Sequence, residues 1–231
     1  MPRQRVPRRI QPILTGLVPV PKAKRRGRPP KDNAGVPHLR RAPFDPRQPI
    51  HVTWKMDEAV TSLRRLPVFH AIEQAMVGGR ERLGVRLVHF SVQDTHIHLI
   101  VEAAGLGALA RGLKGLGIRI ARSVNRTLGR TGQVVIDRYH MHVLTDPLQV
   151  RNAIRYVLQN FRKHIGSFST RGPWAGTDPM SSGRYFDGWR DGVVVTIPAP
   201  SPPPVVGAAT WLLSVGWRRF GLIGIQELPS R

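Results

Sequence analysis

The chain has 231 residues, 41% of them hydrophobic, which suits one domain with extensions or two small domains. Its formal net charge of +22 indicates a polyanionic partner, and nucleic acid is the first candidate. The lack of cysteine excludes disulfides and thiolate chemistry, and no apolar run approaches the roughly 18 residues of a membrane span, so we expect a cytoplasmic protein without a membrane partner.

Residues 1–48 form a basic arm rich in proline and arginine, which we expect to be largely disordered. Residues 1–50 hold 13 lysines and arginines against two acids, a net charge of +11. Within the arm, Arg26-Gly27-Arg28-Pro29 resembles an AT-hook, whose arginines enter an A·T-rich minor groove. The alternative interpretation is a basic tail that binds any phosphate backbone.

Residues 49–195 form the predicted main domain, in which strands and helices follow the order βαββαβα. Alternating hydrophobicity predicts strands over residues 49–56, 84–92, 96–103 and 138–144. Helical periodicity predicts helices over residues 67–83, 106–128 and 145–164, the last opened by Asp146 as N-cap and Pro147 in the first turn. The first six elements have the split βαβ order of a ferredoxin-like α+β fold, an antiparallel sheet with helices on it. The last helix is an addition to that fold.

Residues 196–231 are predicted to be a Pro-rich linker and a C-terminal tail. Leu212, Val215 and Phe220 lie at roughly helical spacing in the tail. We therefore expect one short helix that docks elsewhere on the protein.

His96 and His98 lie two residues apart on a predicted strand, so their side chains project from the same face. Two imidazoles at this spacing can chelate one metal ion. The alternative is a pair of polar residues on a half-exposed strand.

Tyr156 and Asn160 lie four residues apart on one face of the last predicted helix. A tyrosine hydroxyl can attack phosphorus if a metal ion polarises the phosphate. An asparagine oxygen is a hard ligand that can complete a site with two histidines, and such a mixed site suits Mg²⁺ or Mn²⁺. The alternatives are a core tyrosine and a surface amide.

The ordered set "HIHLIV", a basic helix, "DRYHMHVL" and "VRNAIRYVLQN" resembles the HUH-type tyrosine transposases, in particular the single-strand insertion-sequence and REP-associated branch. The resemblance implies that His96, His98 and Asn160 bind Mg²⁺ or Mn²⁺ and that Tyr156 is the nucleophile. It also implies that hairpin-flanked single-stranded DNA is cleaved and rejoined through a 5′-phosphotyrosine, by a monomer or homodimer. This chain has Thr95 where the family often has Asn, and Phe161 where it often has Pro.

Basic residues beyond the arm supply further expected DNA contacts. Arg119, Arg122 and Arg126 share one helical face, with Arg130 beyond it, and the alternative is an ordinary solvated face. The full set of expected DNA contacts is Arg26, Arg28, Arg119, Arg122, Arg126, Arg130, Arg155 and Lys163.

Other histidines and tyrosines leave competing hypotheses open. If the strand of His140 and His142 neighbours that of His96 and His98, four histidines could form a zinc site, and the protein would be a metallohydrolase. The only other tyrosines are Tyr139 and Tyr185, and the loop of Tyr185 either stacks bases or packs on the domain. A further alternative is a catalytically silent DNA- or RNA-binding protein on the same fold.

Overall fold

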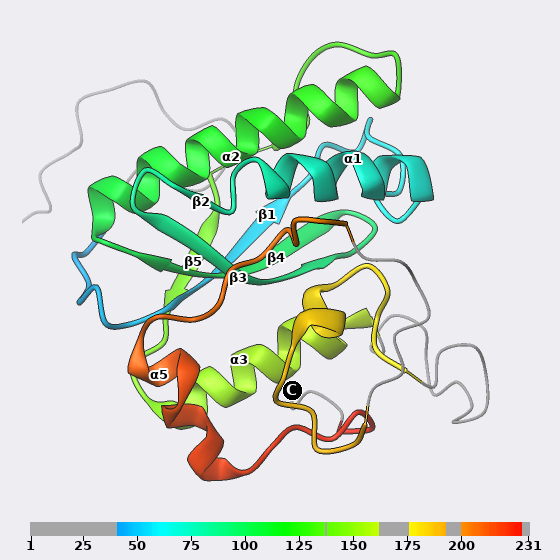
Figure 1. Ribbon diagram of the computed structural model, residues 1–231. Helices are drawn as coiled ribbons and strands as arrows, with labels where there is room; N and C mark the ends of the chain where they lie inside the picture. The colour runs from blue at the N-terminus through cyan, green and yellow to red at the C-terminus, as the bar shows by residue number, and fades with distance from the viewer. Residues whose placement is uncertain (1–40, 137, 162–175, 193–199, 228–231) are drawn as a thin grey trace, which may run out of the picture. The chain divides into compact units, whose positions relative to one another are not determined.

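The described residues of the computed structural model, 41–136, 138–161, 176–192 and 200–227, contain five strands that form one antiparallel sheet (Figure 1). The strands are β1 (Ile50–Lys55), β2 (Glu81–Arg82), β3 (Val85–Val92), β4 (His96–Ala103) and β5 (His140–Val143). Their order in the sheet is β2-β3-β4-β1-β5. Without the two-residue β2, this is the order of the ferredoxin-like fold, so the predicted α+β class is confirmed.

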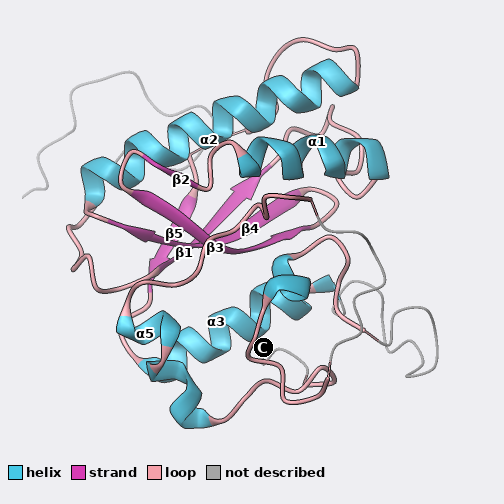
Figure 2. Cartoon of the chain, viewed as in Figure 1, coloured by secondary structure: helices cyan, strands magenta, loops and turns pink. Residues whose placement is uncertain are grey.

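Helices cover both faces of the sheet (Figures 1 and 2). Helices α1 (Leu66–Val77) and α2 (Leu106–Thr127) pack on one face, and α3 (Pro147–Gln159) packs on the other. Alternation along β4 separates the two layers, because Ile97 and Leu99 join the α1–α2 core whereas Ile100 joins the α3 core. Among the described residues, no helix is both long and apolar enough to cross a membrane.

The first helix is shorter than predicted. It ends before Gly78 and Gly79, and Glu81–Arg82 then form β2 rather than a last helical turn. A Cβ atom on Gly79 would lie 2.8 Å from the Cδ1 atom of Leu116 on α2, so a larger residue here would have to displace that side chain. Leu83 and Gly84 both have positive φ, 55° and 75°, as a two-residue hairpin turn needs.

Helix α3 begins as predicted. Asp146 accepts a hydrogen bond from the backbone N–H of Gln149 at 2.9 Å, and Pro147 occupies the first turn. The helix ends at Gln159 with Asn160 as its C-cap, earlier than the predicted end at residue 164. The position of Lys163 lies outside the described residues, as do Arg26 and Arg28.

The C-terminal segment packs against α3 and forms part of its core. It contains α5 (Trp211–Ser214) and the 3₁₀ helix η2 (Gly216–Phe220), and another 3₁₀ helix, η1 (Ser182–Tyr185), precedes it. Leu213, Trp217 and Ile223 are buried in the same cluster as the apolar side of α3. The predicted docking of a short helix is therefore an extensive packing of residues 205–225 on the α3 side of the sheet.

Glu102 anchors the start of this segment to the sheet. Its side chain on β4 is 3% exposed. The carboxylate accepts hydrogen bonds from the backbone N–H groups of Ala209 and Thr210, at 2.9 and 2.7 Å, and from the Thr210 hydroxyl at 2.8 Å. Because such donors would be left unpaired without it, the carboxylate holds α5 in place.

We predict that Glu102→Gln lowers the free energy of unfolding by about 2–3 kcal/mol, because the new amide N–H₂ faces donors that need an acceptor. Urea unfolding followed by circular dichroism measures the effect. The matched control is Glu58→Gln, an exposed glutamate, which should change the unfolding free energy by less than about 0.5 kcal/mol. Equal unfolding midpoints for the two variants would contradict the anchoring role.

Candidate functional site

The side chains of the four predicted site residues meet at one cavity on the α3 side of the sheet. The cavity has a volume of about 440 Å³. It is lined by residues of β1, β4, β5, α3 and the turn between β3 and β4: Thr53, Gln93, Asp94, Thr95, His96, His98, His140, Tyr156 and Asn160. The four side chains therefore converge within a single chain, an arrangement that the sequence left open.

His98 links the sheet to the end of α3. Its Nδ1 lies 3.2 Å from the hydroxyl of Thr53, the residue that pairs with it across β1 and β4. Its Nε2 lies 3.2 Å from the Nδ2 of Asn160, whose side chain is buried. If the amide N–H donates to Nε2, the ring proton of His98 lies on Nδ1 and the lone pair lies at Nε2.

His96 repeats this arrangement at the start of β4. Its Nδ1 lies 2.8 Å from the hydroxyl of Thr95, and its ring is nearly parallel to that of His98, with an interplanar angle of 18° and centroids 6.5 Å apart. A threonine hydroxyl thus contacts Nδ1 of each imidazole. Such contacts orient metal-binding histidines and favour Nε2 as the ligand atom. Thr95, which departs from the family pattern, places its hydroxyl beside the Nδ1 of His96.

Tyr156 lies one helical turn before Asn160. Its ring is perpendicular to that of His98, with centroids 5.3 Å apart and an interplanar angle of 88°. Burial raises the pKa of Tyr156 above its ordinary value of 10.0. The hydroxyl is therefore protonated at neutral pH, and it must lose its proton during any nucleophilic attack.

His51 on β1 is a site residue that the sequence analysis missed. Its ring stacks on His98 with centroids 5.5 Å apart and packs edge-on against Tyr156 at 5.7 Å. Burial, with His142 and His140 nearby, lowers the pKa of His51 to about 4, so the ring is neutral. The alternation of β1 could have revealed it, because His51 and Thr53 share one face of that strand.

The second His-x-His strand does not neighbour the first. Strand β1 lies between β4 and β5, and His142 pairs with His51 rather than with a histidine of β4. The condition for a four-histidine zinc site is therefore not met. Within the described ranges, no three His, Cys, Asp or Glu side chains are grouped to hold a metal ion, so the amide of Asn160 is needed to complete any site here.

The expected DNA-contact residues lie in different places. Arg119, Arg122 and Arg126 are exposed on α2, which covers the sheet face opposite the cavity (Figure 1). Arg130 donates a hydrogen bond to the carbonyl of Gln133 at 3.1 Å. A DNA contact along α2 remains a prediction, and it would be a surface separate from the cavity.

Arg155 does not face solvent as expected. Its guanidinium pairs with Glu227 at 2.7 Å and donates to Asn152 at 3.1 Å, and the side chain is 13% exposed. In the folded chain Arg155 and Arg151 share the single carboxylate of Glu227.

Arg155 belongs to a stripe of α3 that holds the C-terminal segment. Arg151 donates two hydrogen bonds to Glu227, at 2.7 and 2.9 Å. Gln159 donates to the carbonyls of Gly224 and Ile225, at 2.7 and 3.1 Å. Arg151, Arg155 and Gln159 recur every four positions on α3. Arg155 and Gln159 directly precede the cavity residues Tyr156 and Asn160. The C-terminal segment therefore fixes the helix that carries Tyr156 and Asn160.

The other two tyrosines have different surroundings. The guanidinium of Arg41 lies over the Tyr139 ring, 3.6 Å from its centroid. Tyr185 packs against the α1–α2 core. The next residue, Phe186, is 8% exposed and lies edge-to-face with Trp189 at 5.2 Å. The loop was expected either to stack bases or to pack on the domain. Phe186 packs on the domain.

No family model and no curated protein matches the chain. Two solved structures are similar to it. One is a REP-associated tyrosine transposase bound to a REP hairpin, with a TM-score of 0.45 and 14% identity over 59% of this chain and 83% of that one. The other is a candidate transposase from Deinococcus radiodurans R1, with a TM-score of 0.36 and 16% identity over 42% of this chain and 78% of that one.

At these identities the function has to be argued from the side chains of the site.

The attachment of α3 predicts a pH-dependent stability. Hydrogen bonds from Arg151 hold the pKa of Glu227 at about 2, below its ordinary value of 4.5. A lowered carboxylate pKa stabilises the folded state above pH 4.5, and the contribution is lost as the pH falls from 4.5 towards 2. Because this group is near the surface, screening limits the effect to about 1 kcal/mol.

We therefore predict that Glu227→Gln lowers the unfolding free energy by about 1 kcal/mol at pH 7 and that the difference from wild type shrinks below pH 4.5. Denaturant titrations at a series of pH values measure this. Glu58→Gln is again the control. A difference that stays constant down to pH 2 would contradict the ion pair as its source.

Proposed function

We propose that this chain is a metal-dependent transposase that cleaves and rejoins single-stranded DNA through a 5′-phosphotyrosine at Tyr156. The supporting observation is that His98 contacts both Asn160 and Tyr156 at a single cavity, with 3.2 Å between His98 and Asn160 and 5.3 Å between the rings of His98 and Tyr156. Two imidazoles, an amide and a hydroxyl in one place supply both ligand atoms and a nucleophile.

The residues present fit a Mg²⁺ or Mn²⁺ ion. His96, His98 and Asn160 would hold it through two ring nitrogens and one amide oxygen, which leaves positions for oxygens of the phosphate and of water. Asn160 is buried beside His98, with its amide nitrogen 3.2 Å from Nε2, so metal binding through the amide oxygen would require the amide group to turn over. A bound ion would polarise the scissile phosphate and offset its negative charge.

The chain's own groups perform the transfer. The Tyr156 Oη attacks the phosphorus and gives up its proton, the bond between phosphorus and the 3′-oxygen breaks, and the 3′-oxygen leaves as a hydroxyl. The product is a 5′-phosphotyrosine diester. Attack on it by a DNA 3′-OH reverses the step and joins two strands without ATP. The proposed substrate is single-stranded DNA flanked by a hairpin, as the family resemblance implies.

Residues around the site position these groups. The hydroxyls of Thr53 and Thr95 contact Nδ1 of His98 and His96. The neutral His51 ring packs against both His98 and Tyr156, which restricts the orientation of the tyrosine and keeps a like charge away from the metal site. Loss of such supporting contacts typically costs about 10- to 100-fold in metal affinity or activity.

We predict that Tyr156→Phe abolishes both DNA cleavage and the covalent protein–DNA adduct, because it removes the attacking oxygen and keeps the ring. Incubation with hairpin-flanked single-stranded DNA and Mn²⁺, followed by a denaturing gel, measures both. DNA binding and the thermal unfolding midpoint should stay near those of wild type, since the ring contacts with His51 and His98 remain.

Tyr139→Phe and Tyr185→Phe are the matched controls, because these are the other two tyrosines of the chain, and both variants should form the adduct. An adduct with the Tyr156→Phe protein would show that another residue is the nucleophile. A catalytically silent binding protein would form no adduct in any variant, including wild type.

We also predict that removal of residues 1–40 weakens DNA binding and flattens its salt dependence. This region holds 11 of the lysines and arginines against one acid, and fewer counterions leave the DNA when the protein neutralises fewer phosphates. The cut leaves Arg41 over the ring of Tyr139. Binding constants measured over a range of salt concentrations give the slope, and an unchanged slope would show that the arm does not bind DNA.

A further inference from the structure

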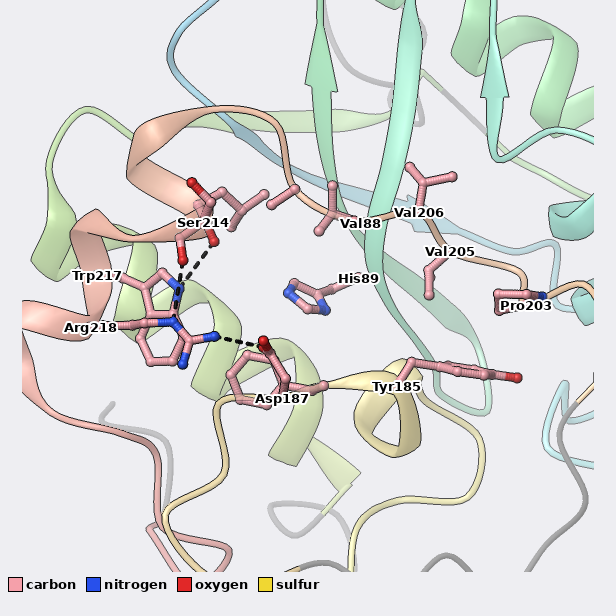
Figure 3. A pocket seen from close by; sticks show the side chains of 14 residues that line it. Val88, His89, Tyr185, Asp187, Pro203, Val205, Val206, Ser214, Trp217 and Arg218 are labelled. Carbon is pink, nitrogen blue, oxygen red and sulfur yellow. Dashed lines mark hydrogen bonds and ion pairs between the residues drawn. The ribbon is translucent and has the colours of Figure 1, made fainter.

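A second cavity lies on the same side of the sheet, with a separate set of lining residues. Its volume is about 560 Å³, within the roughly 300–1,000 Å³ usual for small-molecule sites. Its walls come from β3, from the loop after η1 and from the C-terminal segment (Figure 3). None of these lining residues belongs to the cavity of Tyr156.

A β-bulge directs His89 into this cavity. The pairing of β3 with β4 runs from Leu87 opposite Val101 to His89 opposite Ile100, so Val88 is an extra residue. His89 therefore shares the α3 side of the sheet with Ile100. If β3 alternated regularly after Leu87, His89 would face the α1–α2 core like Leu87. Bulges often re-aim a side chain in this way beside functional sites.

The His89 ring is a buried polar group that is weakly hydrogen-bonded within the protein. It is 8% exposed, and the one hydrogen bond that the described residues offer it, to the Ser182 hydroxyl, is long at 3.5 Å. Burial lowers its pKa to about 4, so the ring is neutral, with one donor and one acceptor nitrogen. Figure 3 shows the imidazole projecting into the cavity.

Aromatic and apolar groups surround this imidazole. The ring of Phe186 lies edge-to-face with His89, with centroids 5.3 Å apart, and 5.5 Å from the ring of Trp217. The indole N–H of Trp217 donates to the Leu213 carbonyl at 3.1 Å, so its polar atom is already paired. Trp217 is 1% exposed and lies beneath the Arg218 guanidinium, so the 8%-exposed Phe186 and the His89 ring are the aromatic groups that a ligand in the cavity could touch.

Arg218 lies at the side of the cavity and can exchange partners. Its guanidinium pairs with Asp187 at 2.7 Å, and the Asp187 side chain is 83% exposed. An ion pair this exposed contributes little stability, so a phosphate could replace the carboxylate at small cost. The strong positive charge of the chain favours a ligand that carries phosphates.

We propose that this cavity binds one unpaired nucleobase of the DNA strand. The edge of the base would hydrogen-bond to His89, its face would contact the exposed part of Phe186, and Arg218 would bind an adjacent phosphate. The inference rests on the proposed function only in taking single-stranded DNA as the substrate. It assigns to this pocket the recognition of one strand position, separate from the chemistry at Tyr156.

The test uses the full chain and single-stranded oligonucleotides that carry one 2-aminopurine at successive positions. Stacking quenches the fluorescence of this base analogue. Ser214 lines the cavity and is partly exposed, so Ser214→Phe places a ring into it, whereas Ser123→Phe on α2 is the matched control on the opposite sheet face. His89→Phe removes both ring nitrogens, and His70→Phe, at an exposed histidine of α1, is its control.

One position of the strand should be strongly quenched by wild type, Ser123→Phe and His70→Phe. The quench should disappear with Ser214→Phe, and His89→Phe should bind the oligonucleotide about tenfold more weakly. Unfolding midpoints of the variants identify any that fail to fold, and a second plug, Ala208→Phe, then replaces Ser214→Phe. Uniform quenching along the strand, or an unaltered quench in the folded plug variants, overturns the proposal.

Free 2-aminopurine deoxyribonucleoside monophosphate is a separate arm. Tight binding of this nucleotide that the oligonucleotide does not displace would mean a free-nucleotide site and would overturn the strand-binding proposal. The Tyr156 adduct is measured in the same samples. An adduct without a position-specific quench contradicts the base pocket alone, and a quench without an adduct contradicts the proposed chemistry alone.

Discussion

The packing of α3 against one face of the sheet is the constraint on which the site depends. Tyr156 and Asn160 are both on this helix, and the histidines that they contact are on β1 and β4. Apolar residues set the helix in place, because Val150, Ile154, Val157 and Leu158 are fully buried against the sheet and the C-terminal segment. Burial of each such side chain stabilises the fold by roughly 1.5–3 kcal/mol, which exceeds the contribution of any polar contact at the site.

The two faces of the sheet have different roles. One face packs against α1 and α2 in a continuous apolar core, and the other carries histidines, threonines and both cavities. Several acidic residues form ion pairs with arginines within the fold. The chain has 14 acids against 36 lysines and arginines, and several of those acids pair internally: Glu73 with Arg184, Asp178 with Arg64, Glu102 with Arg86 and Glu227 with Arg151. Because each of these pairs uses one charge of either sign, the net charge of +22 is unchanged and remains available to a polyanionic partner.

Local pattern was sufficient to predict four of the five strands, helices α1 to α3 and the convergence of residues on a single element. The two-residue period of β4 places His96 and His98 together, and the four-residue spacing on α3 places Tyr156 with Asn160. Those are properties of neighbours in sequence. Helix α1 was predicted too long because Glu81–Arg82 pair with β3 through the turn at Leu83 and Gly84 instead of continuing the helix.

Contacts between residues distant in sequence were not predictable from these patterns. Thr53 and His51 join the site through the register of β1 with β4, which no single segment encodes. Arg155 lies 72 residues before Glu227, so its pairing required the fold of the whole chain. The docking of the C-terminal segment depends on Glu102. Alternation along the strand predicts which sheet face Glu102 lies on, but not which segment packs over that face.

The central claim is that one chain assembles a metal site from β4 and α3. Anomalous diffraction from crystals soaked in Mn²⁺ tests it most directly. The account predicts a peak with the side chains of His96, His98 and Asn160 of the same chain about 2.0–2.6 Å away. A peak at His140 and His142 without these three residues, a site shared between two chains, or no peak at saturating Mn²⁺ would contradict it.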